Sequence, residues 1–563
     1  MSNTQEALAL HTAGRTTEAL ILLFNAIGAA PSQSPAMAEE RLLLASLLDG
    51  VALNSGNAVV FHVLLELLRD PQVDPQSIAR AVLGLLAVHG AFQALEKGQE
   101  NIPALQALFG EPLVRELLRR VIVTDARAER VFAFARRLLI ENSWVNDPEP
   151  WQRDAMLTVA MAAEHGEYAW PDTLDIEALL SSWVELMAEW LDNRNRDSAD
   201  FHAAMVLRLC MFRPLSIVPG AERLLDIPPE WWGSEWHETL QPLLDAQLRE
   251  PLAQHGRGAA LPTLTNGATA TPESAGSDAV RAMYETHPYP RWSTVAKPHV
   301  TTVAAFVQAI TGGSAVPDTR RVLIAGCGTG RQTAHTALSF PDADILALDL
   351  SRASLGYAAR KAEQLGLGNV QFMQGDLLQL DALQEQFALI FCSGVLHHLA
   401  NPAAGWRQLV QRLHPAGVMK VALYSSLARQ PVSAARAVIA AEQFAPTDEG
   451  IRACRQHLLA LPANHAAKPV TESADFFSAS GCRDLLMHVQ ERSYTLAEIE
   501  QDLALHNLRF LGFQLPAPVR AAFTAMFPNA GAANDLEAWA RFEERHPTTF
   551  WGMYQFFVAH RQR

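Results

Sequence analysis

The chain has 563 residues, of which 49% are hydrophobic and 19% charged, and its formal net charge is -15. This composition is typical of a globular protein of about three or four domains and excludes a largely disordered one. The negative charge argues against a general nucleic-acid or anionic-membrane binder, because both of those surfaces require basic residues.

The start of the chain, Met-Ser-Asn-Thr-Gln-Glu, lacks the basic and then apolar layout of a signal peptide. No stretch approaches about 18 uninterrupted apolar residues, so no membrane-spanning segment is expected. The five cysteines are scattered and odd in number, which predicts reduced thiols and no CxxC metal site. We therefore expect a cytoplasmic protein with no membrane, nucleic-acid or metal partner.

Residues 1–255 are predicted to form an all-helical domain, because apolar residues recur at helical spacing. Residues 8–26 suit two amphipathic helices broken near Gly14, and Asp125 is placed to cap a later helix. The run 13–19, followed by Ala26 and Pro31, resembles the second half of a tetratricopeptide repeat. A repeat array needs several stacked units, so an irregular helical bundle is the alternative.

Residues 256–279 are rich in Gly, Ser, Thr and Pro, which predicts a flexible linker. The segment 283–292 follows, Met-Tyr-Glu-Thr-His-Pro-Tyr-Pro-Arg-Trp, in which two prolines stiffen a backbone that presents three aromatic residues and an arginine. This strap has two interpretations. It packs on the surface of the next domain, or it covers a ligand there.

The next segment, residues 321–330, is Arg-Val-Leu-Ile-Ala-Gly-Cys-Gly-Thr-Gly. Its apolar run predicts a buried parallel strand, and its closely spaced glycines predict a tight turn with exposed amides before a helix. A dinucleotide-binding loop would require a third glycine at the position of Arg331. The last glycine, Gly330, lies one residue earlier.

Two further strands are predicted to end in carboxylates. Residues 345–348 lead into Asp349, about 20 residues beyond the loop, where an acid can accept from both ribose hydroxyls. Residues 370–373 lead to Asp376, which can accept from an adenine amino group while Leu377 packs the ring. A fourth strand (388–392) leads to a His-His pair, and residues 418–424 form a fifth after a Pro/Gly stop.

The Gly-x-Gly-x-Gly loop, the two acids, the His-His pair and the Leu-x-Pro-x-Gly segment before the fifth strand lie in order over residues 322–424. This set resembles the class I S-adenosylmethionine-dependent methyltransferases. The resemblance implies an α/β Rossmann-like sheet, mostly parallel with an antiparallel last strand, in residues 280–425 and 506–563. The last two strands are expected at residues 509–513 and 552–558, which makes residues 426–505 an insertion or lid.

The resemblance also implies the site. The residues expected to bind S-adenosyl-L-methionine are Gly326, Cys327, Gly328, Gly330, Asp349, Leu350, Asp376, Leu377, Ser393 and Gly394. The candidate catalytic residues are His397, His398 and Tyr424, since imidazole titrates near neutral pH and suits a general base. The candidate acceptor-binding residues are Tyr284, Tyr289, Arg291, Arg483 and His488.

The predicted function is methyl transfer to a protein or peptide acceptor, because helical repeats often form concave surfaces that bind polypeptides. A small-molecule or glycan-precursor acceptor is the first alternative. A non-catalytic interaction scaffold that keeps the cofactor fold is the second, and a hydride-transfer enzyme is disfavoured by Arg331. A homodimer is compatible with the sequence.

Overall fold

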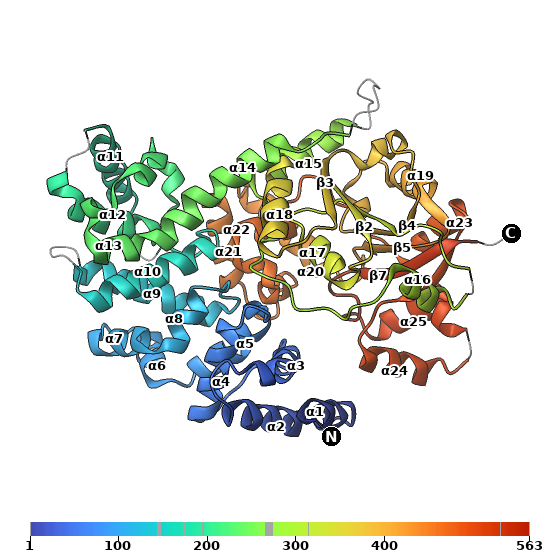
Figure 1. Cartoon of the computed structure of the whole chain (residues 1–563), viewed down its shortest axis with the longest axis horizontal. Coiled ribbons are helices and arrows are strands. Elements are labelled where there is room, and N and C mark those ends of the chain that lie inside the picture. The colour runs from blue at the N-terminus through green and yellow to red at the C-terminus, as the bar shows by residue number, and fades with distance from the viewer. Residues whose placement is uncertain are drawn as a thin grey trace.

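The computed structural model describes residues 2–143, 148–172, 176–193, 196–264, 274–313, 315–529 and 531–561. The N-terminal part is all-helical and forms an arc beside a single sheet (Figure 1). Its helices are α1 (Asn3–Thr12), α2 (Thr16–Gly28), α3 (Ala38–Leu48), α4 (Ala58–Arg69), α5 (Pro75–Leu86), α6 (Gly90–Glu96), α7 (Ile102–Gly110), α8 (Pro112–Leu118), α9 (Ala126–Ser143), α10 (Pro150–His165), α11 (Glu177–Asn193), α12 (Ala199–Cys210), α13 (Pro229–Leu244) and α14 (Glu250–Ala260).

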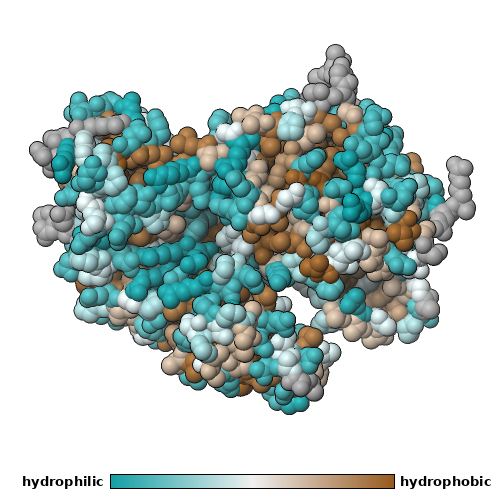
Figure 2. Space-filling view, viewed as in Figure 1, coloured by the Kyte–Doolittle hydropathy of each residue, from teal (hydrophilic) through white to brown (hydrophobic). Residues whose placement is uncertain are grey.

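Two expectations for this region are confirmed in detail. Gly14 lies between α1 and α2 with φ of 78°, which a residue without Cβ adopts at no steric cost. Asp125 accepts a hydrogen bond from the backbone N–H of Ala128 at 2.7 Å and so caps α9. Figure 2 shows hydrophilic residues over most of the visible face of this domain.

The sheet has seven strands in the order β3-β2-β1-β4-β5-β7-β6, and β7 runs antiparallel to both of its neighbours. This is the mostly parallel sheet with an antiparallel last strand that the sequence predicts. The strands are β1 (Arg321–Ala325), β2 (Asp344–Asp349), β3 (Val370–Gln374), β4 (Phe387–Ser393), β5 (Leu413–Leu423), β6 (Leu508–Phe513) and β7 (Tyr554–His560).

The central strand β1 explains where a ligand can bind. It pairs with β2 on one side and β4 on the other, so Ile324 lies between Ala347 and Phe391. The strand order reverses at β1, because β2 and β3 lie on one side of it and β4 and β5 on the other. Sheets of this kind bind ligands in the crevice at the carboxyl ends of the strands, next to the point of reversal. Val322 and Leu323 are fully buried, as expected for a strand covered on both faces.

Helices cover both faces of the sheet and fill the connection between β5 and β6 (Figure 1). These are α15 (Ser274–Thr286), α16 (Val303–Thr311), α17 (Arg331–Ser339), α18 (Arg352–Gln364), α19 (Pro402–Arg412), α20 (Gln430–Glu442), α21 (Asp448–Ala460), α22 (Ala479–Met487), α23 (Leu496–Leu505), α24 (Ala517–Met526) and α25 (Leu536–Arg545), with short 3₁₀ turns at Leu377–Ala382 and Leu396–His398. Helices α20 to α23 lie in the predicted insertion.

The predicted linker at 256–279 is more ordered than its composition suggests. Helix α14 continues to Ala260, Thr263 bridges to Gln374 of β3, and α15 begins at Ser274, while residues 265–273 lie outside the described residues. Gly258 packs so closely on α18 that an added Cβ would lie 2.4 Å from the carbonyl oxygen of Arg352. Gly258 allows α14 and α18 to cross at close range. A glycine-rich composition does not distinguish this role from that of a flexible linker.

Two ion pairs, one buried and one partly exposed, join the helical domain to the rest of the chain. Arg455 of α21 binds Glu129 of α9 at 2.6 Å, and both side chains are almost fully buried. Arg331, at the start of α17, pairs with Asp74 at the start of α5 at 3.2 Å. The helical domain therefore contacts both the insertion and the helix that follows the glycine loop.

Among the described residues, no single helix has the length and apolar character needed to cross a membrane. One bent pair, α5 with α6, meets the criterion only when its two helices are taken together across an 81° bend.

Candidate active site

A cavity of about 1420 Å³ opens at the carboxyl ends of the central strands. Core residues supply most of its wall. The helical domain adds Asp49, Asp74, Gln76 and Ser77, the strap adds Tyr284 and Tyr289, and the insertion adds Asp484. Three segments that are distant in sequence therefore enclose one space.

The glycine loop has the conformation that its sequence predicts. Gly326, Gly328 and Gly330 all have positive φ, at 74°, 52° and 83°. The amides of Gly326 and Cys327 donate to the carbonyl oxygen of Leu348, at 2.8 and 2.9 Å, which fixes the turn against β2. Gly326, Cys327 and Gly328 line the cavity, whereas Gly330 packs on Ala358 of α18.

Asp349 lies beside this loop at the end of β2. Its Oδ2 accepts from the amide of Gly328 at 2.7 Å and its Oδ1 from the amide of Ser351 at 2.9 Å. Burial raises the pKa of Asp349, and the two amide bonds oppose that shift. Each oxygen keeps a lone pair, and both Asp349 and Leu350 line the cavity. The geometry suits the predicted role on a ribose, which stays a prediction.

The remaining predicted cofactor residues also line the cavity: Asp376, Leu377, Ser393 and Gly394. Asp376 Oδ1 accepts from the amide of Leu378 at 2.8 Å, which holds the carboxylate at the edge of the sheet. The hydroxyl of Ser393 is buried and has no hydrogen-bond partner among the described residues. A buried polar atom without a partner costs free energy unless a ligand or water satisfies it.

The strap packs on the glycine loop and also faces the cavity, so its two interpretations are compatible. Trp292 Nε1 donates to the carbonyl oxygen of Thr329 at 3.0 Å, and the Tyr357 hydroxyl donates to the carbonyl oxygen of Trp292 at 2.6 Å. Tyr289 precedes a cis peptide bond to Pro290, and its carbonyl oxygen would lie 2.9 Å from a Cβ added at Gly328.

The rings of the two adjacent histidines contact each other at 4.3 Å, but only one of them borders the cavity. His398 lines the cavity, and its Nδ1 lies 2.8 Å from the carbonyl oxygen of Gln490. His397 is fully buried, stacks on the Tyr424 ring at 4.1 Å, and does not line the cavity. Burial lowers the pKa of His398 to about 4 and that of His397 well below its ordinary value. The structure therefore argues against His397 as the base.

His398, His488 and Asp484 each bring one potential metal-ligand atom within 4.8 Å of the others, a group that sequence spacing did not predict. Each of the three side chains also has a hydrogen-bond partner within the chain. The Gln490 amide donates to His488 Nδ1 at 3.0 Å, so in the neutral ring Nε2 carries the proton and faces the Tyr284 hydroxyl at 3.4 Å. The two imidazole rings stack at 3.7 Å.

Two predicted acceptor-binding arginines point elsewhere. Arg291 pairs with the Glu164 carboxylate at 2.8 Å, and Glu164 belongs to α10 of the helical domain. Arg483 Nη1 lies 2.6 Å from His287 Nδ1, and neither side chain lines the cavity. Both arginines therefore contact other segments of the chain rather than the cavity. Their amino-acid type alone does not predict these partners.

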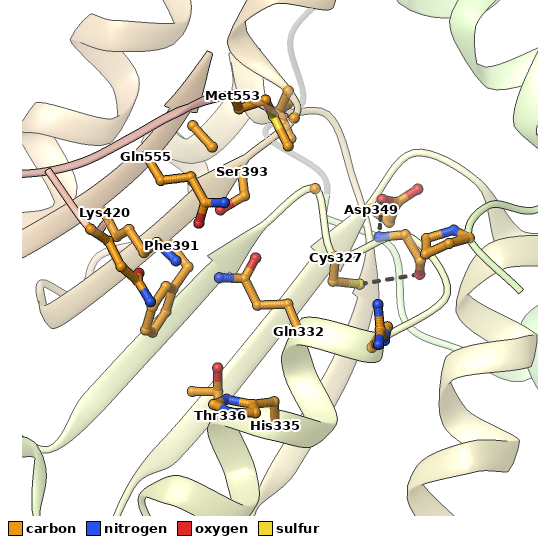
Figure 3. Close-up of a pocket in the computed structure, with 18 of the residues that line it drawn as sticks. Cys327, Gln332, His335, Thr336, Asp349, Phe391, Ser393, Lys420, Met553 and Gln555 are labelled. Atoms are coloured by element: carbon orange, nitrogen blue, oxygen red, sulfur yellow. Dashed lines mark hydrogen bonds between the residues drawn. The ribbon is translucent and has the colours of Figure 1, made fainter. Parts of the chain in front are cut away.

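Lys420 is a cavity residue that the sequence analysis missed. Figure 3 shows it with Gln332 of α17 and Ser393 and Gln555 of the strands around one space. Burial alone lowers the pKa of Lys420 to about 8, and no hydrogen bond or ion pair of its ammonium is found among the described residues. The detectable signal was a lysine within the apolar strand 418–423.

This burial gives a testable stability effect. The folded pKa of Lys420 is depressed below its ordinary 10.5, so burying this side chain has no ionisation cost above pH 10.5, and the cost grows as the pH falls and is complete below about pH 8. We expect Lys420→Met to raise the free energy of unfolding at pH 7 by about 1–2 kcal/mol, discounted for partial hydration. Urea unfolding measures the change.

Lys361 provides a matched control. Its pKa is also lowered to about 8, but its ammonium donates to the carbonyl oxygen of Ser293 at 2.8 Å and lies 5.4 Å from the Trp292 ring centre. Lys361→Met loses those contacts and should not stabilise the chain. Equal effects at the two positions would contradict the assignment of an unpaired Lys420.

Comparison with known proteins identifies the domain. A family model described as a methyltransferase domain matches residues 322–417. An uncharacterised protein of Synechococcus is 30% identical over 265 residues, 43% of this chain and 61% of that protein. The trans-aconitate 2-methyltransferase of Deinococcus radiodurans is 39% identical over 101 residues, 18% of this chain and 36% of that enzyme.

Among solved structures, PKMT2 from Rickettsia typhi in complex with AdoHcy aligns with a TM-score of 0.36 and 17% identity, over 49% of this chain and 55% of that one. The chain thus spans less than two thirds of the length of each of these three proteins. The matched residues carry the glycine loop, both acids and the first four strands of the sheet. Residues 322–417 match the methyltransferase domain family, and the order and directions of the strands are those of the Rossmann-like class I fold, whose cofactor is S-adenosyl-L-methionine.

Proposed function

We propose that the whole chain is an S-adenosylmethionine-dependent methyltransferase that acts on a protein or peptide acceptor. The observation that carries this proposal is the composite wall of the cavity, to which α5 of the helical domain contributes residues such as Asp74 and Gln76. An acceptor that reaches the cofactor would touch the helical domain on its way. A polypeptide has the reach to make both contacts at once.

The size of the cavity supports the same proposal. Typical small-molecule pockets measure about 300–1000 Å³, and this cavity measures about 1420 Å³. The volume leaves space for an acceptor group beside the cofactor. A small-molecule acceptor is the second candidate. The part of the cavity lined by Lys420 and Gln332 favours it, because polar side chains there suit a compact polar ligand.

Methyl transfer is an in-line displacement at the sulfonium methyl, so the protein must align the acceptor and exclude water. In this proposal the cofactor lies against the glycine loop and is held by the carboxylates of Asp349 and Asp376. Tyr289 of the strap and Tyr424, which follows β5, line the part of the cavity that we assign to the acceptor. His398 is neutral near pH 7, because burial lowers its pKa to about 4.

The acceptor class can be tested with methyl-labelled S-adenosylmethionine in a bacterial lysate, followed by size fractionation. We expect label in the protein fraction with the wild-type chain, and none with Asp349→Asn, whose single carbonyl oxygen cannot replace both carboxylate oxygens in accepting from the Gly328 and Ser351 amides. Label confined to small metabolites would replace the protein acceptor by a small one. Absence of S-adenosylhomocysteine binding in calorimetry would instead favour the non-catalytic scaffold.

A further inference from the structure

Two tyrosine–aspartate pairs connect the strap to the insertion at the acceptor side of the cavity. The Tyr284 hydroxyl donates to Asp484 Oδ1 at 2.6 Å, and the Tyr289 hydroxyl donates to Asp475 Oδ1 at 2.7 Å. Asp484 lines the cavity together with both tyrosines, whereas Asp475 does not. Asp484 therefore borders the cavity, and its hydrogen bond with Tyr284 fixes the position of its carboxylate.

No cation neutralises Asp484 among the described residues. Arg429, which precedes α20, favours the charged form of Asp484, but it forms its ion pair with Glu491 at 2.7 Å and lies 3.6 Å from the centre of the Tyr424 ring. Arg436 also binds Glu491, at 3.0 Å.

The other titratable groups that face Asp484 are Asp475, His398, His488 and the three tyrosines Tyr284, Tyr289 and Tyr424. Burial keeps both histidines neutral, because it lowers the pKa of His398 to about 4 and that of His488 to about 2. Three carboxyl groups (Asp475, Asp484 and Glu491) therefore stand against two arginines (Arg429 and Arg436), so this side of the cavity has no excess of positive charge.

Burial also acts on the carboxyl itself and raises the pKa of Asp484 to about 7, with Asp475 and Glu491 adding to the shift and the Tyr284 hydroxyl opposing it. A carboxyl of this kind exchanges a proton near neutral pH, as a general base must. The carboxylate and the tyrosine rings together suit a cationic group, which is attracted by charge and by aromatic faces.

We propose that the Asp484–Tyr284 pair binds the acceptor as an amine, and that Asp484 is the catalytic base that deprotonates it. The inference rests on the proposed methyltransferase function and narrows its acceptor to a primary or secondary amine, on a peptide or on a small molecule. A carboxylate acceptor would be repelled by Asp484.

The proton balance is as follows. The ammonium R–NH₃⁺ gives one proton to the Asp484 carboxylate and becomes R–NH₂. The nitrogen lone pair attacks the sulfonium methyl, the C–N bond forms as the S–CH₃ bond breaks, and the products are R–NH₂–CH₃⁺ and neutral S-adenosylhomocysteine. Asp484 then releases its proton to water.

A cofactor analogue tests this without the natural acceptor. In sinefungin a carbon that bears an ammonium group replaces the sulfur of S-adenosylhomocysteine, so it presents an amine where the methyl group is transferred. We expect the wild-type chain at pH 8 to bind sinefungin at least tenfold more tightly than S-adenosylhomocysteine, about the contribution of one hydrogen bond to a charged group. The preference should shrink at pH 6, where Asp484 is protonated.

Asp484→Asn should remove this preference at pH 8 and leave the Kd of S-adenosylhomocysteine within about twofold, since the amide oxygen still accepts from Tyr284. Asp475→Asn alters the other tyrosine–aspartate pair and should retain the preference. A preference that survives Asp484→Asn, or is absent from the wild type, would overturn the amine site. Failure of the wild type to bind S-adenosylhomocysteine would overturn the proposed function itself.

Discussion

Arg455→Met is expected to lower the free energy of unfolding by about 3–5 kcal/mol, the usual cost of leaving one member of a buried ion pair without its partner. Arg455 is fully buried, and its guanidinium binds Glu129 through two contacts, at 2.6 and 3.1 Å. It also donates to the carbonyl oxygens of Phe476 and Ala169. Urea unfolding followed by circular dichroism measures the loss.

The double variant Glu129→Met/Arg455→Met separates charge from hydrogen bonding. It removes the uncompensated carboxylate, so it should recover much of the loss, and the remainder reports the two carbonyl oxygens left without a donor. Arg15→Met breaks an ion pair with Glu18 whose two side chains are more than half exposed, and it should leave stability unchanged. A double variant as unstable as Arg455→Met would contradict the buried-charge explanation.

The sheet could be predicted because its strands are local patterns. Each strand is an apolar run bounded by polar residues or glycine. The two carboxylates, Asp349 and Asp376, lie at the ends of β2 and β3. The start of β5 is the exception. The sequence predicts a stop at Pro415 and Gly417, yet β5 runs from Leu413, and the register shift between Phe387 and Leu389 of β4 accommodates the extra residues. A bulge depends on the partner strand, which sequence does not show.

The cavity wall at the strand ends could be predicted for the same reason, whereas the wall formed by the strap and the insertion could not. Tyr284 and Asp484 are 200 positions apart and meet only because the insertion folds over the strap. His397 and His398 are adjacent in sequence, yet one is sealed in the core and the other borders the cavity. A motif gives the residue types at a strand end but not the direction of each side chain.

Gly326→Ala is expected to weaken S-adenosylhomocysteine binding by at least tenfold. The residue has φ of 74°, and an added Cβ would lie 2.3 Å from Val395 Cγ2, well inside contact distance. Relief requires the loop to move away from the loop after β4, which shifts the Cys327 and Gly328 amides and the bond from Gly328 to Asp349. Because the proposed cofactor site lies against this backbone, we expect small shifts of the loop to reduce affinity. Isothermal calorimetry measures the change in Kd.

Two variants divide this effect into its causes. Gly312→Ala, at the end of α16, has the same kind of positive φ, at 63°, but nothing lies within 4 Å of its added Cβ. It carries the backbone strain alone and should leave the Kd unchanged. Gly326→Ala/Val395→Ala removes the clashing methyl groups and should restore part of the affinity, because only the strain of a few tenths to about 1 kcal/mol then remains. If the double variant binds no better than Gly326→Ala, the contact with Val395 does not position the loop, and the loss must come from the backbone conformation itself.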